Sequence, residues 1–443
     1  MFKRKVYNKL LEWKNKYSEK YAVMLEGARR VGKSTIAEEF AKNEYKSYIL
    51  IDFANTSNEV LEIFEDISNL DIFFLRLQTL TNTKLYIHES VIIFDEVQLF
   101  PIARQAIKYL VKDGRYNFIE TGSLISIKKN VKNILIPSEE YKINVYPLDF
   151  EEFLWATNLC DYDLINIINE NGKSIGDAVN RQLMRNFRIY MAVGGMPQAV
   201  EAFLEHKTFE EIDFVKREII SLYMDDFKKI DPTGRISQIY ASIPSQLSAN
   251  KKRYILSNAI NKRITNKDEE LLQELIDSKT VLICYNSTQP SLSLSQTKNL
   301  NSYKLYISDI GLFTTLLFND ESRTNEQIYQ KLLSNKLDIN LGYIYENAVA
   351  QLIKANNREL YYHTWKKENS THHYEIDFLI IKNKKVVPIE VKSGIVNNFN
   401  SLHAFCKKYS SVVGERYVFS QKDLSNQEMI KMRPFYLSQI ILK

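Results

Sequence analysis

Short apolar runs separated by amphipathic stretches mark the first third of the chain. Strands are predicted where these runs lie, at Tyr21–Glu26, Ser47–Phe53, Val91–Phe94, Tyr116–Glu120 and Tyr141–Tyr146. The helical segments between them require crossover connections, which produce a parallel sheet with helices on both faces. The pattern therefore predicts one α/β domain over residues 1–149.

The spacing of apolar residues becomes helical after this domain. Residues 150–235 are predicted to form a helical lid subdomain with one sharp turn at Gly194–Pro197. Further helical stretches lead to two short strands, Thr280–Tyr285 and Tyr303–Ile307. Helices followed by a two-stranded ribbon predict a winged-helix domain over residues 236–320.

A second α/β pattern occupies residues 321–443. Helices are predicted at Tyr343–Ala355 and Ser401–Lys408. Strands are predicted at Leu360–Thr364, Tyr374–Ile381, Lys385–Val391 and Glu415–Phe419. The predicted fold class is therefore multidomain α/β, with four parts along the chain.

The composition of the chain restricts which class of protein it can belong to. The chain has 443 residues, more than one hydrophobic core usually serves. Its formal net charge of +5 permits nucleic-acid binding but is too small at this length to argue for it. Cys160, Cys284 and Cys406 are odd in number and far apart, which predicts a reducing compartment rather than a disulfide framework. No apolar run approaches the ~20 residues that span a bilayer, so a cytoplasmic protein without a membrane partner is expected.

The stretch after the first predicted strand matches the phosphate-loop pattern G-x-x-x-x-G-K-[ST]. Its glycines allow backbone N–H groups to point at phosphate oxygens, and the following helix presents its positive N-terminus to the anion. Lys33 is predicted to reach the β- and γ-phosphates of ATP, and Ser34 to ligate Mg²⁺. An ordinary glycine turn is the alternative, but the strand before the loop and the helix after it favour nucleotide binding. The predicted binding residues are Gly27, Ala28, Arg29, Arg30, Val31, Gly32, Lys33, Ser34 and Thr35.

Two acidic residues end a later apolar strand. The four apolar residues Val91–Phe94 suit a strand buried on both faces, and Asp95 and Glu96 follow directly. Asp95 is predicted to hold Mg²⁺ through water, and Glu96 to polarise the attacking water. Thr121 and Ser123, at the end of a further strand, are both candidates to sense the γ-phosphate, with a plain turn as an equal alternative.

The phosphate loop and acidic strand resemble the AAA-type ATPases. Three further segments resemble one bacterial and archaeal group: Tyr-Pro-Leu-Asp-Phe-Glu-Glu-Phe at residues 146–153, Gly-Gly-Met-Pro at 194–197, and Tyr-Lys-Leu-Tyr-Ile-Ser-Asp-Ile-Gly-Leu at 303–312. Members of this group join an AAA-type ATPase to a C-terminal restriction-endonuclease-like domain, usually through a winged helix. One departure is that residues 123–146 lack the arginine that the group commonly carries there. Arg104 and Arg115 are unranked alternatives for an arginine finger.

Acidic residues and a lysine recur near the C-terminus. Alternate side chains of a strand share a face, so Glu390 and Lys392 are predicted to point together, near Asp377 of the preceding strand. Carboxylates from neighbouring strands suit Mg²⁺ or Mn²⁺, and a lysine beside them can orient a water. A solvated Glu–Lys pair is the alternative. Pro388 is predicted to mark a bulge at the site.

The Asp…Glu-x-Lys arrangement resembles the PD-(D/E)xK nucleases. This resemblance implies catalytic roles for Asp377, Glu390 and Lys392, with Glu346, Asp377 and Glu390 as metal ligands. It also implies a nucleic-acid partner, with DNA expected. Residues 251–253 and 262–263, basic segments of the predicted winged helix, either contact phosphates or form a solvated face.

The predicted function is Mg-dependent ATP hydrolysis coupled to a nucleic-acid-acting C-terminal domain. The alternative is an ATP-dependent switch whose C-terminal domain binds DNA or a protein without cleavage. An adaptor with an inert nucleotide site is a third class, against which the intact Lys33 and Glu96 argue. Assembly into a homo-oligomer is left open.

Overall fold

The computed structural model describes residues 2–122, 137–249, 252–319, 324–337, 341–368, 370–394 and 399–443. The chain divides into two compact units, Met1–Tyr146 with Asp277–Lys279, and Pro147–Ile276 with Thr280–Lys443. The first unit ends close to the boundary predicted at residue 149. The other three predicted parts fall together in the second unit, so their division stays a prediction.

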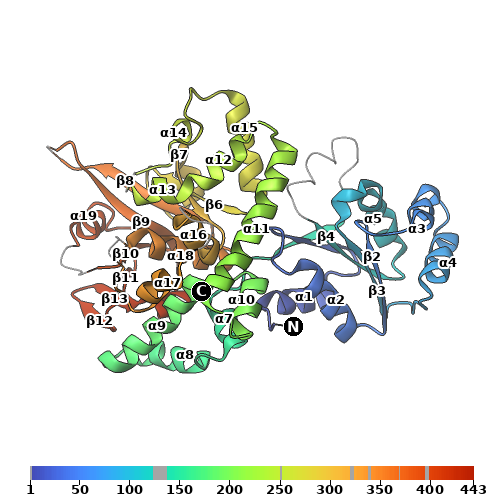
Figure 1. The fold of residues 1–443 in the computed structure, drawn as a ribbon, viewed down its shortest axis with the longest axis horizontal. Coiled ribbons are helices and arrows are strands. Elements are labelled where there is room, and N and C mark those ends of the chain that lie inside the picture. Colours follow the sequence, from blue (N-terminus) through green and yellow to red (C-terminus); the bar gives the residue numbers. More distant parts are fainter. Residues whose placement is uncertain are drawn as a thin grey trace. The chain divides into compact units, whose positions relative to one another are not determined.

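A parallel sheet forms the first unit (Figure 1). Over the described residues it has five strands in the order β2-β3-β4-β1-β5, and each neighbouring pair is parallel. The strands are β1 (Ala22–Glu26), β2 (Ser47–Asp52), β3 (Ser90–Asp95), β4 (Asn117–Gly122) and β5 (Glu140–Asn144). The helices are α1 (Lys5–Lys16), α2 (Lys33–Glu44), α3 (Asn58–Glu62), α4 (Leu70–Thr81) and α5 (Pro101–Asp113), with short 3₁₀ turns η1 (Ile63–Asp66) and η2 (Val97–Leu99). The predicted parallel α/β core is thereby confirmed.

Burial on both faces explains the strand sequences. Every residue of β3 is buried, as its four successive apolar residues predict. One face packs against α4, α5 and η1 in a core rich in phenylalanine, whereas α2 buries Ile36 and Phe40 on the other side. Because the strands are parallel, the carboxyl ends of β1, β3 and β4 meet at one edge of the sheet, where ligands bind in folds of this class.

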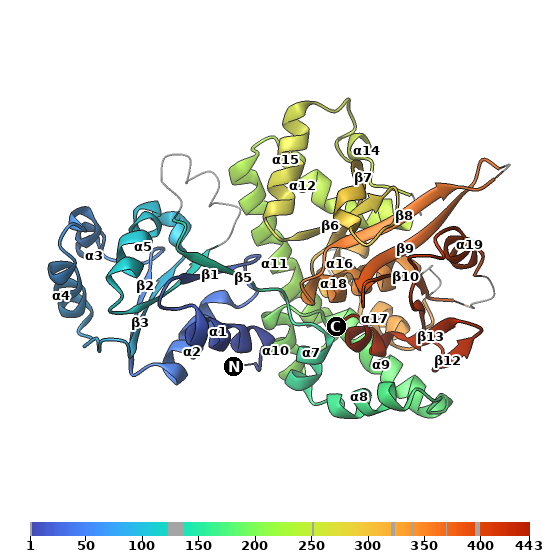
Figure 2. The same ribbon diagram turned by 180° about the vertical axis from the view of Figure 1, so that it is seen from behind.

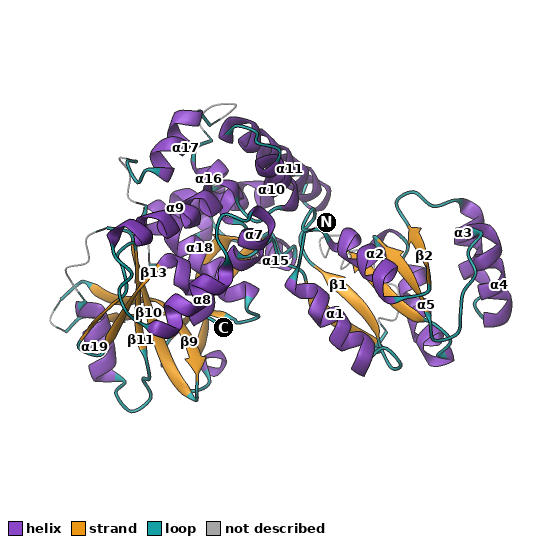
Figure 3. Cartoon of the chain, turned by 90° about the horizontal axis from the view of Figure 1, so that it is seen from below, coloured by secondary structure: helices purple, strands orange, loops and turns teal. Residues whose placement is uncertain are grey.

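The second unit begins with helices, as predicted (Figure 3). They are α7 (Phe150–Thr157), α8 (Tyr162–Asn171), α9 (Asp177–Val193), α10 (Pro197–Leu204) and α11 (Phe209–Ile230). Capping boxes start two of them: Asp149 and Glu152 cap α7, and Thr208 and Glu211 cap α11. Later helices are α12 (Arg235–Ala241), α13 (Ile243–Ser248), α14 (Leu256–Ile260), α15 (Asn266–Asp277), α16 (Ile310–Leu317) and α17 (Glu326–Leu333).

The predicted turn between α9 and α10 is a point of close backbone packing. Gly195 exchanges hydrogen bonds with two distant segments: its carbonyl accepts from the Leu148 N–H at 2.7 Å, and its N–H donates to the Asp309 carboxylate at 2.6 Å. A Cβ on Gly195 would overlap the Leu148 carbonyl oxygen. The glycine is therefore required by close approach of two backbones.

A mixed sheet forms the rest of the second unit (Figure 2). In the described ranges it has eight strands, in the order β12-β13-β11-β10-β9-β8-β6-β7. They are β6 (Val281–Ser287), β7 (Lys298–Ile307), β8 (Leu360–Lys366), β9 (His373–Lys382), β10 (Lys385–Lys392), β11 (Arg416–Ser420), β12 (Ser425–Gln427) and β13 (Ile430–Pro434). The other elements are α18 (Gly342–Ala355), α19 (Asn400–Lys408), α20 (Ser438–Ile441), η3 (Leu294–Thr297) and η4 (Phe435–Leu437).

The hairpin β6–β7 is the predicted two-stranded ribbon, but it does not stand apart. β6 pairs in parallel with β8, so the sheet continues across the boundary predicted at residue 320. Residues 281–307 and 360–434 therefore share one sheet, which brings β7 side chains within reach of those on α18 and β9.

A bulge interrupts the β8–β9 pair. Tyr361 pairs with Leu379 and His363 with Ile376, so Tyr362 alone faces Asp377 and Phe378. Such a bulge re-aims the side chains of the bulged strand. The bulge predicted at Pro388 is corrected by this register: Pro388 pairs regularly with Leu379, and the irregularity lies on β9 at Asp377.

The Gly195→Ala variant is expected to be less stable than the wild type by about 1–3 kcal/mol, because the new methyl group must displace the Leu148 backbone. Urea unfolding followed by circular dichroism measures this. Gly394→Ala is the control, since a Cβ there meets nothing within 4 Å. Equal stability of the two variants would contradict the close-packing argument.

Buried His363 provides a pH-dependent element of stability. Its Nδ1–H donates to the Ser287 carbonyl at 2.6 Å, and the Tyr409 hydroxyl lies 3.1 Å from Nε2, which is free to accept in the neutral ring. Burial, opposed by the Ser287 hydrogen bond, lowers the pKa of His363 from 6.5 to about 4. The folded state therefore holds the neutral ring where the unfolded chain takes up a proton.

The free energy of unfolding is expected to fall as pH drops from 6.5 toward 4, with His363 contributing up to about 1.4 kcal/mol per pH unit. His363→Gln should show a shallower pH dependence in urea unfolding, and exposed His372→Gln should keep the wild-type slope. A wild-type slope in His363→Gln would exclude this contribution.

Candidate functional site

The phosphate-loop residues connect β1 to α2 as predicted. The loop runs from Gly27 to Gly32, and α2 begins at Lys33. Gly32 has φ 92°, in the left-handed region that favours glycine, and a Cβ on Gly27 would overlap the Val145 carbonyl oxygen. Both pattern glycines are thus required by backbone geometry.

The Lys33 side chain lies within the loop that precedes it. Its ammonium donates to the carbonyl oxygens of Gly27 at 3.1 Å and Ala28 at 3.0 Å, and only 5% of the residue is exposed. Burial lowers the pKa of Lys33 to about 8, while Glu96 and Asp95 favour the charged form. An anion beside the loop would favour the ammonium further, because opposite charge offsets desolvation.

Asp95 connects the side chains at this edge of the sheet by hydrogen bonds. Its Oδ1 accepts a hydrogen bond from the Ser34 hydroxyl at 2.7 Å and another from the Thr121 hydroxyl. The Thr121 oxygen in turn accepts the Glu96 N–H at 3.3 Å. Three predicted residues, Ser34, Asp95 and Thr121, are therefore brought together, whereas Ser123 lies outside the described residues.

Glu96 stands at a backbone turn directly after β3. Its φ of 52° is left-handed, and its carboxylate accepts a hydrogen bond from the Gln98 side-chain amide. The sequence did not identify Gln98 as a functional residue. Its position two residues after Glu96 was the only sign of such a role. The amide orients the Glu96 carboxylate.

Both arginines considered for an arginine finger are held in ion pairs. Arg104 is 2% exposed and forms a two-pronged pair with Glu140 at 2.6 and 2.8 Å. Arg115 pairs with Asp113 and Asp71, each at 2.7 Å. Both guanidinium groups are therefore already bound by carboxylates.

The C-terminal acids lie in a network of ion pairs that includes lysines. The Lys304 ammonium, on β7, lies 2.7 Å from the Glu346 carboxylate on α18 and 2.7 Å from that of Glu375 on β9. The Tyr306 hydroxyl donates to the same oxygen of Glu346. Lys252 reaches the second oxygen of Glu375 at 2.8 Å.

Asp377, Glu390 and Lys392 form the adjoining part of this cluster. Lys392 lies 3.0 Å from one Glu390 oxygen, and the other, Oε1, is buried without a hydrogen-bond partner in the described part of the chain. Asp377 accepts the Val391 N–H at 2.7 Å. Burial and the nearby Glu346 raise the pKa of Asp377 to about 7, against the opposing effect of Lys392 and Lys304.

The predicted metal set of Glu346, Asp377 and Glu390 is not gathered around one point. Within the described ranges, no group of three or more His, Cys, Asp or Glu side chains is arranged to hold a metal ion. The physical reason is ion pairing, since Lys304 holds Glu346 and Lys392 holds Glu390. Lys304 and Lys252 were not predicted to join this cluster because they come from distant segments, whereas Glu375 lies two residues before Asp377 on β9 and was not predicted to take part.

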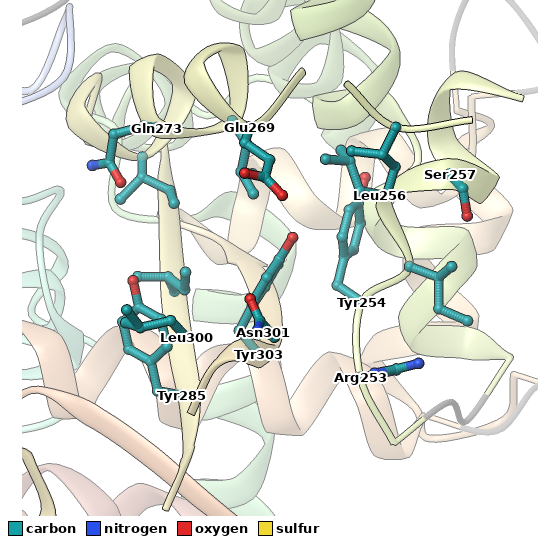
Figure 4. A pocket seen from close by; sticks show the side chains of 15 residues that line it. Arg253, Tyr254, Leu256, Ser257, Glu269, Gln273, Tyr285, Leu300, Asn301 and Tyr303 are labelled. Carbon is teal, nitrogen blue, oxygen red and sulfur yellow. The ribbon is translucent and has the colours of Figure 1, made fainter. Parts of the chain in front are cut away.

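A separate cavity of about 560 Å³ lies among α14, α15 and the β6–β7 hairpin (Figure 4). Tyr254, Tyr285 and Tyr303 line it, and the rings of Tyr254 and Tyr303 stack with centroids 6.3 Å apart. Figure 4 shows Glu269 directed toward Tyr303. Arg253 also lines the cavity.

Comparison with protein families matched three separate segments. Residues 19–154 match a family described as an AAA domain, and they form an AAA-type P-loop ATPase domain. Residues 184–323 and 341–435 match two domains of unknown function, DUF8612 and DUF4143. A comparison with curated proteins found no match. Among the described helices, none has the length and apolar character needed to cross a membrane.

Solved structures gave distant similarities. PCH-2 of C. elegans is 13% identical, covering 37% of this chain and 44% of that one, with a TM-score of 0.20. The second is the STAND protein PH0952 of Pyrococcus horikoshii, which has a tetratricopeptide repeat sensor. It is 13% identical, covering 79% of this chain and 48% of that one, with a TM-score of 0.28. VC1899 of Vibrio cholerae is 10% identical, covering 95% of this chain and 96% of that one, with a TM-score of 0.19. The chain thus spans less than half the length of the first two, and at these scores the likeness supports no conclusion about fold or function.

Proposed function

We propose that the AAA-type domain of residues 19–154 binds ATP together with Mg²⁺ and hydrolyses it. The observation that carries this proposal is the hydrogen bond from the Ser34 hydroxyl to the Asp95 carboxylate at 2.7 Å. It places a hydroxyl at the start of α2 beside an acid at the end of β3. Hydroxyl and carboxylate oxygens are the ligands that Mg²⁺ prefers, so the residues fit the ion.

The residues at this edge of the sheet each have a role in the proposed reaction. The N–H groups of residues 27–34 would bind the phosphates, and Lys33 would contribute its positive charge. Ser34 and Asp95 would hold Mg²⁺, which supplies charge neutralisation at the phosphates. Glu96, oriented by Gln98, would position the attacking water.

Hydrolysis also benefits from a cation that stabilises charge in the transition state. Because Arg104 and Arg115 are engaged in ion pairs, we place the source of this cation outside the domain. A second copy of the chain is the proposed source, which makes a homo-oligomer part of the hypothesis.

Lys33→Ala is expected to lose nucleotide affinity, and Glu96→Gln is expected to bind ATP but hydrolyse it about 10²-fold more slowly or worse. Calorimetric titration with ATP and steady-state phosphate release measure the two effects. Lys42→Ala, on the exposed face of α2, is the matched lysine control. Wild-type turnover by Glu96→Gln would exclude its assigned role.

For the C-terminal part we propose metal-dependent phosphodiester hydrolysis as a second function. The specific observation is that Asp377, re-aimed by the β9 bulge, lies in the same charged cluster as Lys392, which pairs with Glu390. The unpartnered, buried Oε1 of Glu390 fits a divalent cation as an oxygen ligand. Asp377 and Glu390 would hold Mg²⁺ or Mn²⁺ once Glu390 leaves Lys392, and Glu346 would join once it leaves Lys304, because the described residues as they stand do not form a metal site. The ion would polarise a phosphoryl oxygen, and Lys392 would orient a water.

DNA is the proposed partner of this half of the chain. The tyrosine-lined cavity beside Arg253 supports contact with nucleic acid, because aromatic rings stack on bases and arginine contacts phosphates. The alternative function is a switch that binds DNA or a protein. It would use the same surface but would not cleave the bound partner.

Incubation with Mn²⁺ is expected to produce cleavage products from DNA with the wild type and a loss of about 10²-fold or more with Asp377→Ala. Supercoiled, linear, single-stranded DNA and RNA are tested in parallel. Glu428→Ala, an exposed acid between β12 and β13 at the edge of the same sheet, is the control. Identical product patterns for wild type and Asp377→Ala would favour the switch.

A further inference from the structure

Arg4 is a buried cation beside the phosphate loop that the proposed reaction does not use. Only 8% of the residue is exposed. Its Nη1 donates to the Val31 carbonyl at 3.1 Å, and its Nη2 donates to the Tyr146 carbonyl at 2.6 Å. A single guanidinium therefore joins the phosphate loop to the segment that follows β5. Arg4 also lies before residues 19–154, the part of the chain that matches the AAA domain.

Helix α1 begins directly after Arg4 and fixes the position of its backbone. The Tyr7 hydroxyl of this helix donates to the Glu44 carboxylate, at the end of α2, at 2.7 Å. The ring of Tyr17, which follows α1, stacks on that of Tyr141 in β5 with centroids 5.0 Å apart. Helix α1 is thus attached to the helix that follows the phosphate loop and to the strand that leads to the second carbonyl. These contacts keep Arg4 close to both of the carbonyls that it binds.

The segment that carries this second carbonyl also contacts the start of the loop. The Val145 N–H donates to the Glu26 carbonyl at 2.7 Å, and a Cβ on Gly27 would overlap the Val145 carbonyl oxygen. The segment is therefore in direct contact with the beginning of the loop, and Arg4 connects it to Val31 near the end of the loop. Both ends of the loop are held against the same short piece of chain.

The contact with Val31 also orients a backbone donor. In a trans peptide, the carbonyl of one residue and the N–H of the next point in opposite directions. Because Arg4 holds the Val31 carbonyl on one side, the Gly32 N–H is held pointing to the other. The Gly32 N–H is one of the donors assigned to the phosphates. A planar guanidinium can hold two acceptors in a fixed geometry, whereas an ammonium is a single point of attachment.

We infer that Arg4 is a positioning residue of the nucleotide site, which holds the phosphate loop in the conformation that receives ATP by joining Val31 to Tyr146. The inference rests on the proposed ATP binding and adds a residue that acts on the loop rather than on the nucleotide. The loop binds the phosphates in the substrate and in the transition state alike. A residue that orders the loop therefore lowers the KM for ATP and leaves kcat nearly unchanged.

Removal of the guanidinium is the direct test. The full-length Arg4→Met variant, which keeps the apolar stem, is expected to raise the KM for ATP about tenfold or more, with kcat within about twofold of the wild type. Arg4→Lys should resemble Arg4→Met, because it restores the charge without the two-carbonyl bridge. Steady-state phosphate release measures both constants, and Arg76→Met, exposed on α4, is the matched arginine control. A wild-type KM in Arg4→Met, or full rescue by Arg4→Lys, would overturn the inference.

The Tyr7→Phe variant separates positioning of the loop from general stabilisation. It removes a hydrogen bond that attaches α1 to α2 and leaves both carbonyl contacts of Arg4 in place. Its melting temperature is expected to fall while its KM for ATP stays at the wild-type value. If Tyr7→Phe raised the KM as much as Arg4→Met does, Arg4 would be a structural residue only and the inference would fail.

Hydrogen–deuterium exchange without nucleotide reads the order of the loop independently of ATP. Residues 27–34 are expected to exchange faster in Arg4→Met than in the wild type, with β3 unchanged as the internal reference. Equal exchange of the loop in the two proteins would overturn the inference. If the wild type binds no ATP but Arg4→Met exchanges faster in the loop, Arg4 still orders the loop and the proposed nucleotide function fails.

Discussion

Pairing of buried charges governs the geometry of both candidate sites. At the nucleotide site, Asp95 is 8% exposed and is held by hydroxyl donors from Ser34 and Thr121. A carboxylate at this depth requires such donors, because its desolvation is otherwise uncompensated. The same requirement draws Lys304 between Glu346 and Glu375 in the C-terminal cluster.

The two sites stabilise their buried carboxylates with different kinds of groups. In the AAA-type domain, neutral hydroxyls hold the acid, so a cation can approach Asp95 without displacing a resident charge. In the C-terminal cluster, ammonium groups already neutralise Glu346 and Glu390. Residues of the right chemical type therefore do not by themselves make a ready metal site, since a competing internal cation changes what an added ion must displace.

Sheet continuity is what allows Lys304 to take this role. The parallel pairing of β6 with β8 makes the predicted ribbon an extension of the C-terminal sheet, and β7 forms its edge. A lysine that belongs by sequence to one predicted domain thus completes the electrostatics of another. The tyrosine-lined cavity lies against the same hairpin, so a ligand bound there would contact the element that carries Lys304.

The sequence alone determined the local elements and the loop chemistry. Apolar periodicity predicted the described strands of both sheets except β12 and β13, and it predicted the helices α2, α18 and α19, because side-chain burial repeats with the local backbone period. Glycine spacing likewise predicted the phosphate loop, since only that backbone curls as required. Tertiary structure alone decided the β9 bulge, the hydrogen bond of Gln98 to Glu96, and the pairing of Lys304 with Glu346, which lies 42 positions along the chain. Electrostatic partners depend on distance in space, and a pattern of apolar and polar positions carries no record of that distance.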